Sequence, residues 1–245
     1  MTDTDPSLDA GALASTIADM AVQLHHEPTM EDTVDRLLEF ALKALGCAHA
    51  GVIFVHKGKK VETIAATDDV VAKLDAIQMQ IGQGPDIEVL SDRTSVLVRD
   101  VRTEARWPEW ASLVASTGIR SMLGMRLYTS STTIGSLNFY DPEPDHFDLH
   151  DRQVAHVLAR HAAIALDNAR DSENLWKAID ARKLIGQAQG ILMERFAIDA
   201  DQAFAVLMRY SQHHNVKLHT VAEQLVMTRS LPPAPPQAAS GGPSR

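Results

Sequence analysis

The chain reads ARKLIGQAQGILMERF from Ala181 to Phe196. Its apolar residues recur every three or four positions, which predicts a helix with one apolar side. The polar side chains between them fall on the other side of that helix. The apolar positions are Ile185, Ala188, Ile191, Leu192 and Phe196.

Two more helices are expected after this one. Asp199 and Gln202 stand at the spacing of a capping box, which predicts that a second helix begins there. Asn215 is expected to be the N-cap of a third helix. The predicted apolar faces are Ala203, Phe204, Leu207, Met208 and Ser211 on the second helix, and Leu218, Val221, Ala222, Leu225 and Val226 on the third. Three short helices of this kind close one small core.

Two glycines, Gly186 and Gly190, lie inside the first of these helices. Each glycine in a helix interior costs about 1 kcal/mol relative to alanine. Two explanations are open and compatible. Another helix approaches too closely for a side chain, or the bare backbone admits a nucleic-acid loop.

The order and spacing of residues 181–226 resemble the ANTAR domain, a three-helix RNA-binding module of bacterial regulators that control transcription termination. The family signature corresponds here to Ala188, Gly190 and Met193. The chain has Gln189 where the family commonly has lysine.

This resemblance implies that the first helix contacts RNA, with Arg182 and Lys183 neutralising phosphate and Gln187 and Gln189 reading base edges. Without the motif around it, the charged pair would be interpreted as a solvated helix face. The residues expected at the RNA are Arg182, Lys183, Gln187, Ala188, Gln189, Gly190, Met193 and Arg195 on the first helix, with Ser211 and Lys217 nearby.

The charge of the chain is unevenly distributed. The whole chain has 23 basic and 32 acidic residues and a net charge of −9. Residues 176–229 carry seven basic and five acidic residues, so this segment is +2 and the remainder is −11. A segment of such modest charge favours recognition of a structured RNA loop by shape, stacking and base edges.

The composition is that of an ordinary globular protein, with 245 residues of which 45% are hydrophobic, and we expect two domains. No run of eighteen apolar residues is present, and residues 1–6 lack the pattern of a secretory signal. We therefore expect a cytoplasmic protein without membrane contact. The single cysteine, Cys47, is expected in the core beside Leu45. Residues 231–245 are rich in Pro, Ala, Gly and Ser and are expected to form a disordered tail.

Residues 7–169 alternate between helical and strand patterns. Thr29 and Asp32 predict the start of a helix, and Gly46 predicts its end. A mostly antiparallel sheet flanked by helices follows, so the fold class is α+β. The expected strands are 50–55, 61–66, 95–98, 122–128 and 133–140, and the expected helices are 13–24, 29–45, 70–79 and 108–117.

This arrangement resembles a GAF domain, the small-molecule-sensing fold of many bacterial signalling proteins. The residues Gly82-Gln83-Gly84-Pro85, Val96 to Asp100, Arg106-Trp107-Pro108, Gly118 and Ser121 follow the order of actinobacterial GAF domains that are joined to ANTAR modules. Many relatives have glutamate at the position of Gln83 and cysteine at that of Asp86.

The resemblance to GAF domains implies an unidentified small-molecule ligand, and no other cofactor is expected. Phe54, Asp86, Trp107 and Trp110 are the candidates to line its cavity over the sheet. The tryptophans also suit a second interpretation, in which they are simply core residues.

A long helix is expected to connect the two domains. Asp148 can cap a helix that runs without proline or glycine from 149 to 185. The predicted organisation is a GAF-like domain at 7–168, the connecting helix and coiled coil at 148–185, and the ANTAR domain at 176–229. A seven-residue seam is the pattern of a two-stranded coiled coil, although a single solvated helix remains the alternative. The resemblances to GAF and ANTAR domains imply a homodimer. The seam residues are Val154, Leu158, His161, Ala165, Asn168, Ser172, Leu175 and Ile179.

No motif of an enzyme or a metal site is found. The chain lacks a nucleophile elbow, a phosphate-binding P-loop and a zinc-binding His-Glu-x-x-His helix. The pairs His25-His26 and His213-His214 point about 100° apart on a helix, so they are expected at the surface. We therefore expect no enzyme, and the resemblance to GAF and ANTAR proteins implies a dimeric regulator that binds RNA stem-loops and prevents transcription termination. Two alternatives stay open: a ligand sensor that acts through a protein partner, and a DNA-binding regulator.

Overall fold

The computed structural model describes residues 17–24, 26–56, 61–91, 93–130 and 132–231. The chain divides into two compact units, Met1–Asp171 and Ser172–Arg245, and each unit is described by itself. The predicted tail lies outside the described residues from position 232 onward. The start of the first predicted helix, at 13–16, also lies outside them, and residues 17–24 are helical.

The first unit is built on one five-stranded antiparallel sheet with the strand order β2-β1-β5-β4-β3. All five strands predicted from the sequence are present, with ends that differ by at most one residue. The strands are β1 (His49–Val55), β2 (Val61–Ala66), β3 (Ser95–Val98), β4 (Ser121–Tyr128) and β5 (Thr133–Asp141).

Besides the helical residues 17–24, seven α-helices of the described residues surround the sheet or follow it in the chain. They are α2 (Met30–Leu45), α3 (Asp69–Ile81), α4 (Pro85–Ser91), α5 (Pro108–Val114), α6 (Leu149–Phe196), α7 (Ala200–His214) and α8 (Leu218–Thr228). The cap predicted for α2 is confirmed, because the Thr29 side chain accepts a hydrogen bond from the amide of Asp32 at 3.1 Å. Helix α4 was not predicted, since its seven residues are too few to show a period.

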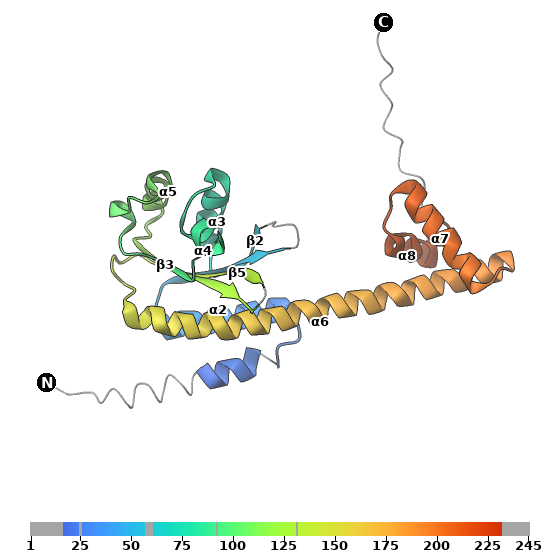
Figure 1. Ribbon diagram of the computed structural model, residues 1–245, viewed down its shortest axis with the longest axis horizontal. Helices are drawn as coiled ribbons and strands as arrows, with labels where there is room; N and C mark the ends of the chain where they lie inside the picture. Colours follow the sequence, from blue (N-terminus) through green and yellow to red (C-terminus); the bar gives the residue numbers. More distant parts are fainter. Residues whose placement is uncertain (1–16, 25, 57–60, 92, 131, 232–245) are drawn as a thin grey trace, which may run out of the picture. The chain divides into compact units, whose positions relative to one another are not determined.

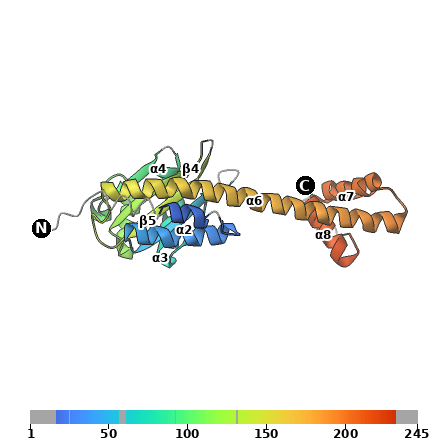
Figure 2. The same cartoon turned by 90° about the horizontal axis from the view of Figure 1, so that it is seen from below.

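Helices cover both faces of the sheet in the first unit. Helices α3, α4 and α5 lie over one face, and α2 and the first part of α6 lie over the other (Figure 1). Seen from below, α2 and α6 run alongside each other (Figure 2). Alternate residues of β4 and β5 enter the two cores: Leu123 and Phe139 face α2 and α6, and Met122 and Tyr140 face the opposite helices.

Helix α6 contributes two different sides in the first unit, and this corrects the predicted seam. Val154 and Leu158 are buried against the sheet and α2, so they are unavailable to a second chain. The exposed apolar residues lie on a different side of the helix from Val154 and Leu158. Val157 is 37% exposed and Ile164 is 53% exposed. Among the described helices, none is apolar enough over a sufficient length to cross a bilayer.

In the second unit, the end of α6 packs with α7 and α8 around a small apolar core that includes Ala188, Leu192 and Leu207. The capping box predicted at Asp199 and Gln202 is confirmed, with both of its hydrogen bonds present. The prediction for Asn215 is wrong. Asn215 adopts the left-handed conformation that ends α7, at φ 51°, and Lys217 precedes the first residue of α8.

Candidate functional site

The side of α6 that faces away from the core of the second unit is polar and carries exposed cations together with the exposed carboxylate of Glu194. Arg182, Lys183, Gln187 and Arg195 are exposed, and Met193 is exposed at its edge. Neither Arg182 nor Lys183 forms an ion pair with any described residue. Both cations are therefore available to an external anion such as a phosphate.

The two glycines of this helix lie in open space. A Cβ atom placed on Gly186 or Gly190 would meet no atom within 4 Å, apart from the helix's own neighbouring backbone. Close approach of another helix within the described chain therefore does not explain them. The helix instead presents bare backbone to whatever approaches from outside.

Three of the residues expected at the RNA have internal roles in the structure. Ala188 is fully buried in the three-helix core, so it cannot touch a ligand, and we correct that expectation. The Gln189 amide donates a hydrogen bond to the Ala200 carbonyl at 3.0 Å, which ties α6 to the start of α7. The Ser211 hydroxyl donates to the Val216 carbonyl at 2.6 Å and holds the turn before α8. The Ser211 bond uses the only hydrogen of that hydroxyl, whereas the Gln189 amide has a second N–H.

A groove of about 440 Å³ between α6 and α8 brings two expected residues together with one that sequence reasoning missed. Gln187, Gly190 and the acidic Glu194 line it from α6, and Arg229 lines it from the end of α8. Arg229 ends α8 in the left-handed conformation, at φ 58°. No sequence pattern marked Arg229, because its place beside α6 depends on how the helices pack. Lys217, also expected at the RNA, is exposed at the start of α8.

The four candidate ligand residues of the first unit do not line one cavity. Phe54 packs with the core between the sheet and α2 and α6, where the Arg170 guanidinium lies 5.8 Å from the centre of its ring. Trp107 and Trp110 belong to the core on the opposite face, and their rings meet edge to face at 5.9 Å. The sheet separates Phe54 from the tryptophans, so we correct the expectation that they share a cavity.

Asp86 belongs to a buried polar cluster on the face of the sheet that α3 and α4 cover. The Gln78 side chain donates a hydrogen bond to Asp86 Oδ2 and accepts one from the Asp86 amide at 2.8 Å. Asp86 Oδ1 and the side-chain amide of Asn138 are buried without a partner in hydrogen-bonding geometry among the described residues. Burial, and next the charge of Asp75, raise the pKa of Asp86 well above its ordinary value.

Asp75 completes this cluster, and sequence reasoning missed it. Its carboxylate accepts hydrogen bonds from Thr63 Oγ1 at 2.8 Å and from the Tyr140 hydroxyl at 3.0 Å. Burial raises the pKa of Asp75 to about 6 despite these two donors. A signal in the sequence was the pair of polar residues Ser136 and Asn138 inside the buried strand β5. Buried polar atoms without partners are rare in proteins and mark places where a water or a ligand binds.

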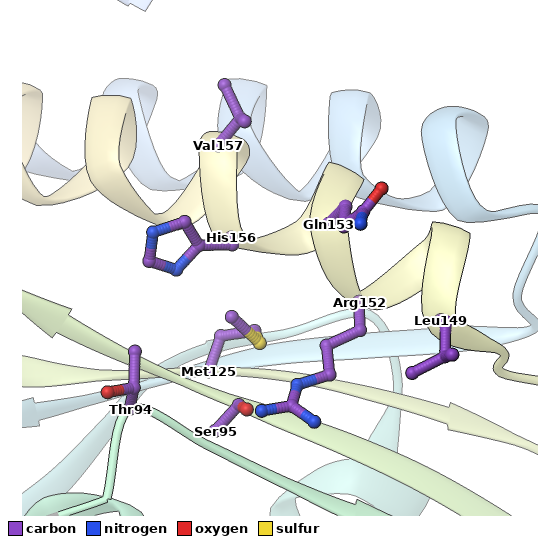
Figure 3. Close-up of a pocket in the computed structure, with 8 residues that line it drawn as sticks. All are labelled: Thr94, Ser95, Met125, Leu149, Arg152, Gln153, His156 and Val157. Atoms are coloured by element: carbon purple, nitrogen blue, oxygen red, sulfur yellow. The ribbon is translucent and has the colours of Figure 1, made fainter.

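A separate surface hollow of about 590 Å³ lies between the sheet edge at β3 and the first turns of α6 (Figure 3). Arg152 extends towards Ser95, and Val157 points away from the sheet. None of the four expected ligand residues lines this hollow. Its lining residues are Thr94, Ser95, Met125, Leu149, Arg152, Gln153, His156 and Val157.

Comparison with known proteins gives two family matches and a set of similar folds. The family model of the ANTAR domain matches residues 173–226, and that of the GAF domain matches residues 27–167. No curated protein matches the chain.

Three similar solved structures illustrate the fold. The GAF domain of an Acinetobacter phosphoenolpyruvate-protein phosphotransferase is 12% identical, with a TM-score of 0.53 over 66% of this chain and 98% of that one. A GAF domain from Synechocystis, in its photoproduct state, is 16% identical, with a TM-score of 0.50 over 60% of this chain and 99% of that one. The photosensory core module of the Stigmatella aurantiaca phytochrome is 11% identical, with a TM-score of 0.60 over 90% of this chain and 47% of that one. At these identities the likeness concerns the fold alone.

Proposed function

This chain belongs to the GAF domain family and carries an ANTAR domain on its C-terminal side. From this we infer that the protein is a regulator that binds RNA in response to a signal. We propose that its second unit binds stem-loops in nascent transcripts and thereby prevents transcription termination. The observation that carries this proposal is the ANTAR match over residues 173–226. In this segment α6 exposes Arg182 and Lys183, which form no ion pair with the described residues, beside two glycines in open space.

The contacts divide by chemistry. Arg182 and Lys183 neutralise phosphates, which supplies affinity but no sequence preference. Gln187 and Arg229 line the groove between α6 and α8, where an amide and a guanidinium suit the edges of unpaired bases. Gly190 in the same groove lets the RNA approach the helix backbone.

A gel-shift experiment tests the proposal with three probes: short RNA hairpins, the same hairpins as DNA, and duplex DNA. We expect the full-length protein to prefer hairpin RNA. The double substitution Arg182→Ala/Lys183→Ala should weaken binding to all loop sequences alike and lower the slope of log affinity against log salt by roughly 1 to 2. The matched control Lys43→Ala/Lys73→Ala removes two exposed lysines from the first unit and should change neither quantity.

The outcomes separate this proposal from its alternatives. Preference for duplex DNA would favour a DNA-binding regulator, and no binding of any probe would favour a sensor that acts through a protein partner. Unchanged hairpin binding by the folded double variant would overturn the assignment of Arg182 and Lys183.

The signal enters, in this proposal, through the buried polar cluster of the first unit. Asp86 Oδ1 and the side-chain amide of Asn138 have no partner in hydrogen-bonding geometry among the described residues, although Asn138 lies close enough to Asp86 to oppose the rise in its pKa. A small molecule with hydrogen-bonding groups would satisfy both. The indole Nε1 of Trp110, on the same face of the sheet, is also buried without a partner among the described residues. This supports Asp86 and Trp110 as ligand residues and leaves Phe54 as a residue of the opposite core.

The chain acts as a homodimer in this proposal, with α6 as the element that pairs. The support is the exposed apolar residues Val157 and Ile164 in the first unit, and Leu175 and Ile179 in the second, which are 61% and 46% exposed. Large exposed apolar side chains that recur on one side of a helix mark a surface that another chain covers.

A further inference from the structure

Three aromatic rings gather on one side of α7, and none of them is among the residues assigned to RNA so far. The rings of Tyr210 and His214 lie 4.3 Å apart between centroids and are tilted by 43°. The rings of His213 and His214 meet edge to face at 4.8 Å. The adjacent histidines, which the sequence placed at the surface without a role, therefore form one continuous aromatic surface with Tyr210.

A shallow hollow of about 260 Å³ lies at these rings. It is lined by Val206, Arg209, Tyr210, His213 and His214, all of which come from α7. His213 and Arg209 are exposed, while Tyr210 and His214 are half-buried. Tyr210 also packs against the three-helix core, which holds its ring in place while leaving it only partly buried.

The charge around the hollow suits a polyanion. No acidic residue occurs from Gln202 to Ala222, although the chain has 32 of them. The same stretch contains Arg209 and Lys217, which form no ion pair with the described residues. A phosphate backbone could thus pass over this side of α7 without meeting a carboxylate of that stretch.

Apolar side chains alone would suit a protein partner, but this surface combines flat rings with a guanidinium and no acid. Unpaired bases stack on tyrosine and histidine rings and on arginine planes, and such stacking is tolerant of sequence. A paired base in a duplex has no free face to offer. The chemistry therefore selects an unpaired nucleotide.

We propose that the rings of Tyr210, His213 and His214, with Arg209, form a stacking site for an unpaired base of the RNA loop. This proposal rests on the proposed function, because it adds a second contact to the same RNA. It places part of the recognition on α7, where the sequence had pointed only to Ser211 beside the residues of the first helix.

The test uses the full-length protein and a pool of RNA hairpins with one stem and a randomised loop. The tightest-binding hairpin is then made with an abasic site at each loop position in turn, and each is measured against the wild type, Tyr210→Leu and Tyr210→Phe. Leucine keeps apolar packing but removes the ring, and phenylalanine keeps the ring. His219→Ala, which removes an exposed histidine from α8, is the matched control.

We expect Tyr210→Leu to bind the intact hairpin ~5- to 150-fold more weakly, which corresponds to about 1–3 kcal/mol for one stacked base. Tyr210→Phe and His219→Ala should bind as the wild type does. At one loop position, the abasic site should weaken hairpin binding by the wild type but not by Tyr210→Leu, because the variant already lacks the ring on which the base stacks. Circular dichroism establishes that each variant is folded.

The two proposals fail in different ways. If the wild type retains hairpins but the effects of Tyr210→Leu and of every abasic site simply add, the stacking site is wrong and RNA binding stands. A loss shared equally by Tyr210→Leu and Tyr210→Phe would also overturn it, since the ring would not be the group that matters. If the wild type selects no hairpin from the pool, the proposed function itself fails.

Discussion

Asp75 is the residue whose titration should be most visible in the stability of the protein. Its pKa is raised from 3.8 to about 6 by burial, so the folded state holds a proton that the unfolded state releases between these values. The free energy of unfolding should therefore fall as the pH rises from about 4 to 6, by on the order of 2 kcal/mol for this group.

Urea denaturation between pH 4 and pH 7.5 measures this effect. Asp75→Asn should lose this part of the pH dependence, and the slope that remains should belong to the other groups, Asp86 included. Asp69→Asn, an exposed change on the same helix, should behave as the wild type. Identical slopes for Asp75→Asn and the wild type would show that Asp75 is already ionised at low pH in the folded protein.

Asp86 offers a test of the sensor site that does not require the ligand to be known in advance. Fractions of a small-molecule extract from cells that make the protein are screened for those that raise its melting temperature. A fraction that stabilises the wild type should have little effect on Asp86→Asn, since the unmatched carboxylate oxygen is lost, while Asp69→Asn should respond fully. Equal stabilisation of all three proteins would place the ligand elsewhere.

At the scale of the helices, the two glycines inside α6 lower the stability of the second unit, and no contact among the described residues requires them. Because nothing lies within 4 Å of an added Cβ, Gly186→Ala and Gly190→Ala should each stabilise the second unit by about 1 kcal/mol. Both should also weaken hairpin binding if the RNA approaches the backbone there. Denaturation midpoints and gel shifts on the same samples measure the two effects.

The reverse substitution on α7 separates affinity from stability. Ala205→Gly, at an exposed position, should destabilise by a similar amount and leave hairpin binding unchanged. Stabilised glycine variants that bind RNA as well as the wild type would show that the open backbone serves another purpose.

The elements with strong local signals were predictable from sequence. The caps at Thr29 and Asp199 were confirmed, because a side-chain acceptor and the amide it binds lie within three residues of each other. Asn215 was misassigned because asparagine serves equally well before a helix and in the left-handed position that ends one. The side of α6 that faces the sheet was predicted to be a dimer seam. A helix that packs on a sheet and a helix in a coiled coil both repeat apolar residues every three or four positions, so the pattern does not distinguish them.

The candidate sites were less predictable, because they depend on contacts between distant segments. The exposed cations of α6 followed from helical spacing alone. Arg229, Asp75 and Tyr210 could not be assigned this way, since each acquires its role from residues on other elements or from the shape of a surface. Phe54 shows the same limit, because alternation along β1 says which residues share a face but not which face holds a ligand.

For the whole molecule, we predict a homodimer in which two copies of α6 pair. Val157 and Ile164 expose apolar surface on the side of α6 turned away from the core, and pairing with a second chain would bury it. Ile164→Asp should convert a dimer into a monomer in sedimentation equilibrium at micromolar concentration. Leu113→Asp on α5, where leucine is 43% exposed, should leave the dimer intact. A wild type that is monomeric at that concentration would contradict the prediction.

Helix α6 supplies residues to two hydrophobic cores, and this sets an order of events on the ribosome. The core of the first unit is complete once Leu166 has emerged, so that unit can close while synthesis continues. Ala188 and Leu192 must wait for Leu207 and Val221, which are made seconds later. During that interval the last turns of α6 leave their apolar side bare, and a translational pause between α6 and α7 would prolong the time in which the nascent chain depends on chaperones.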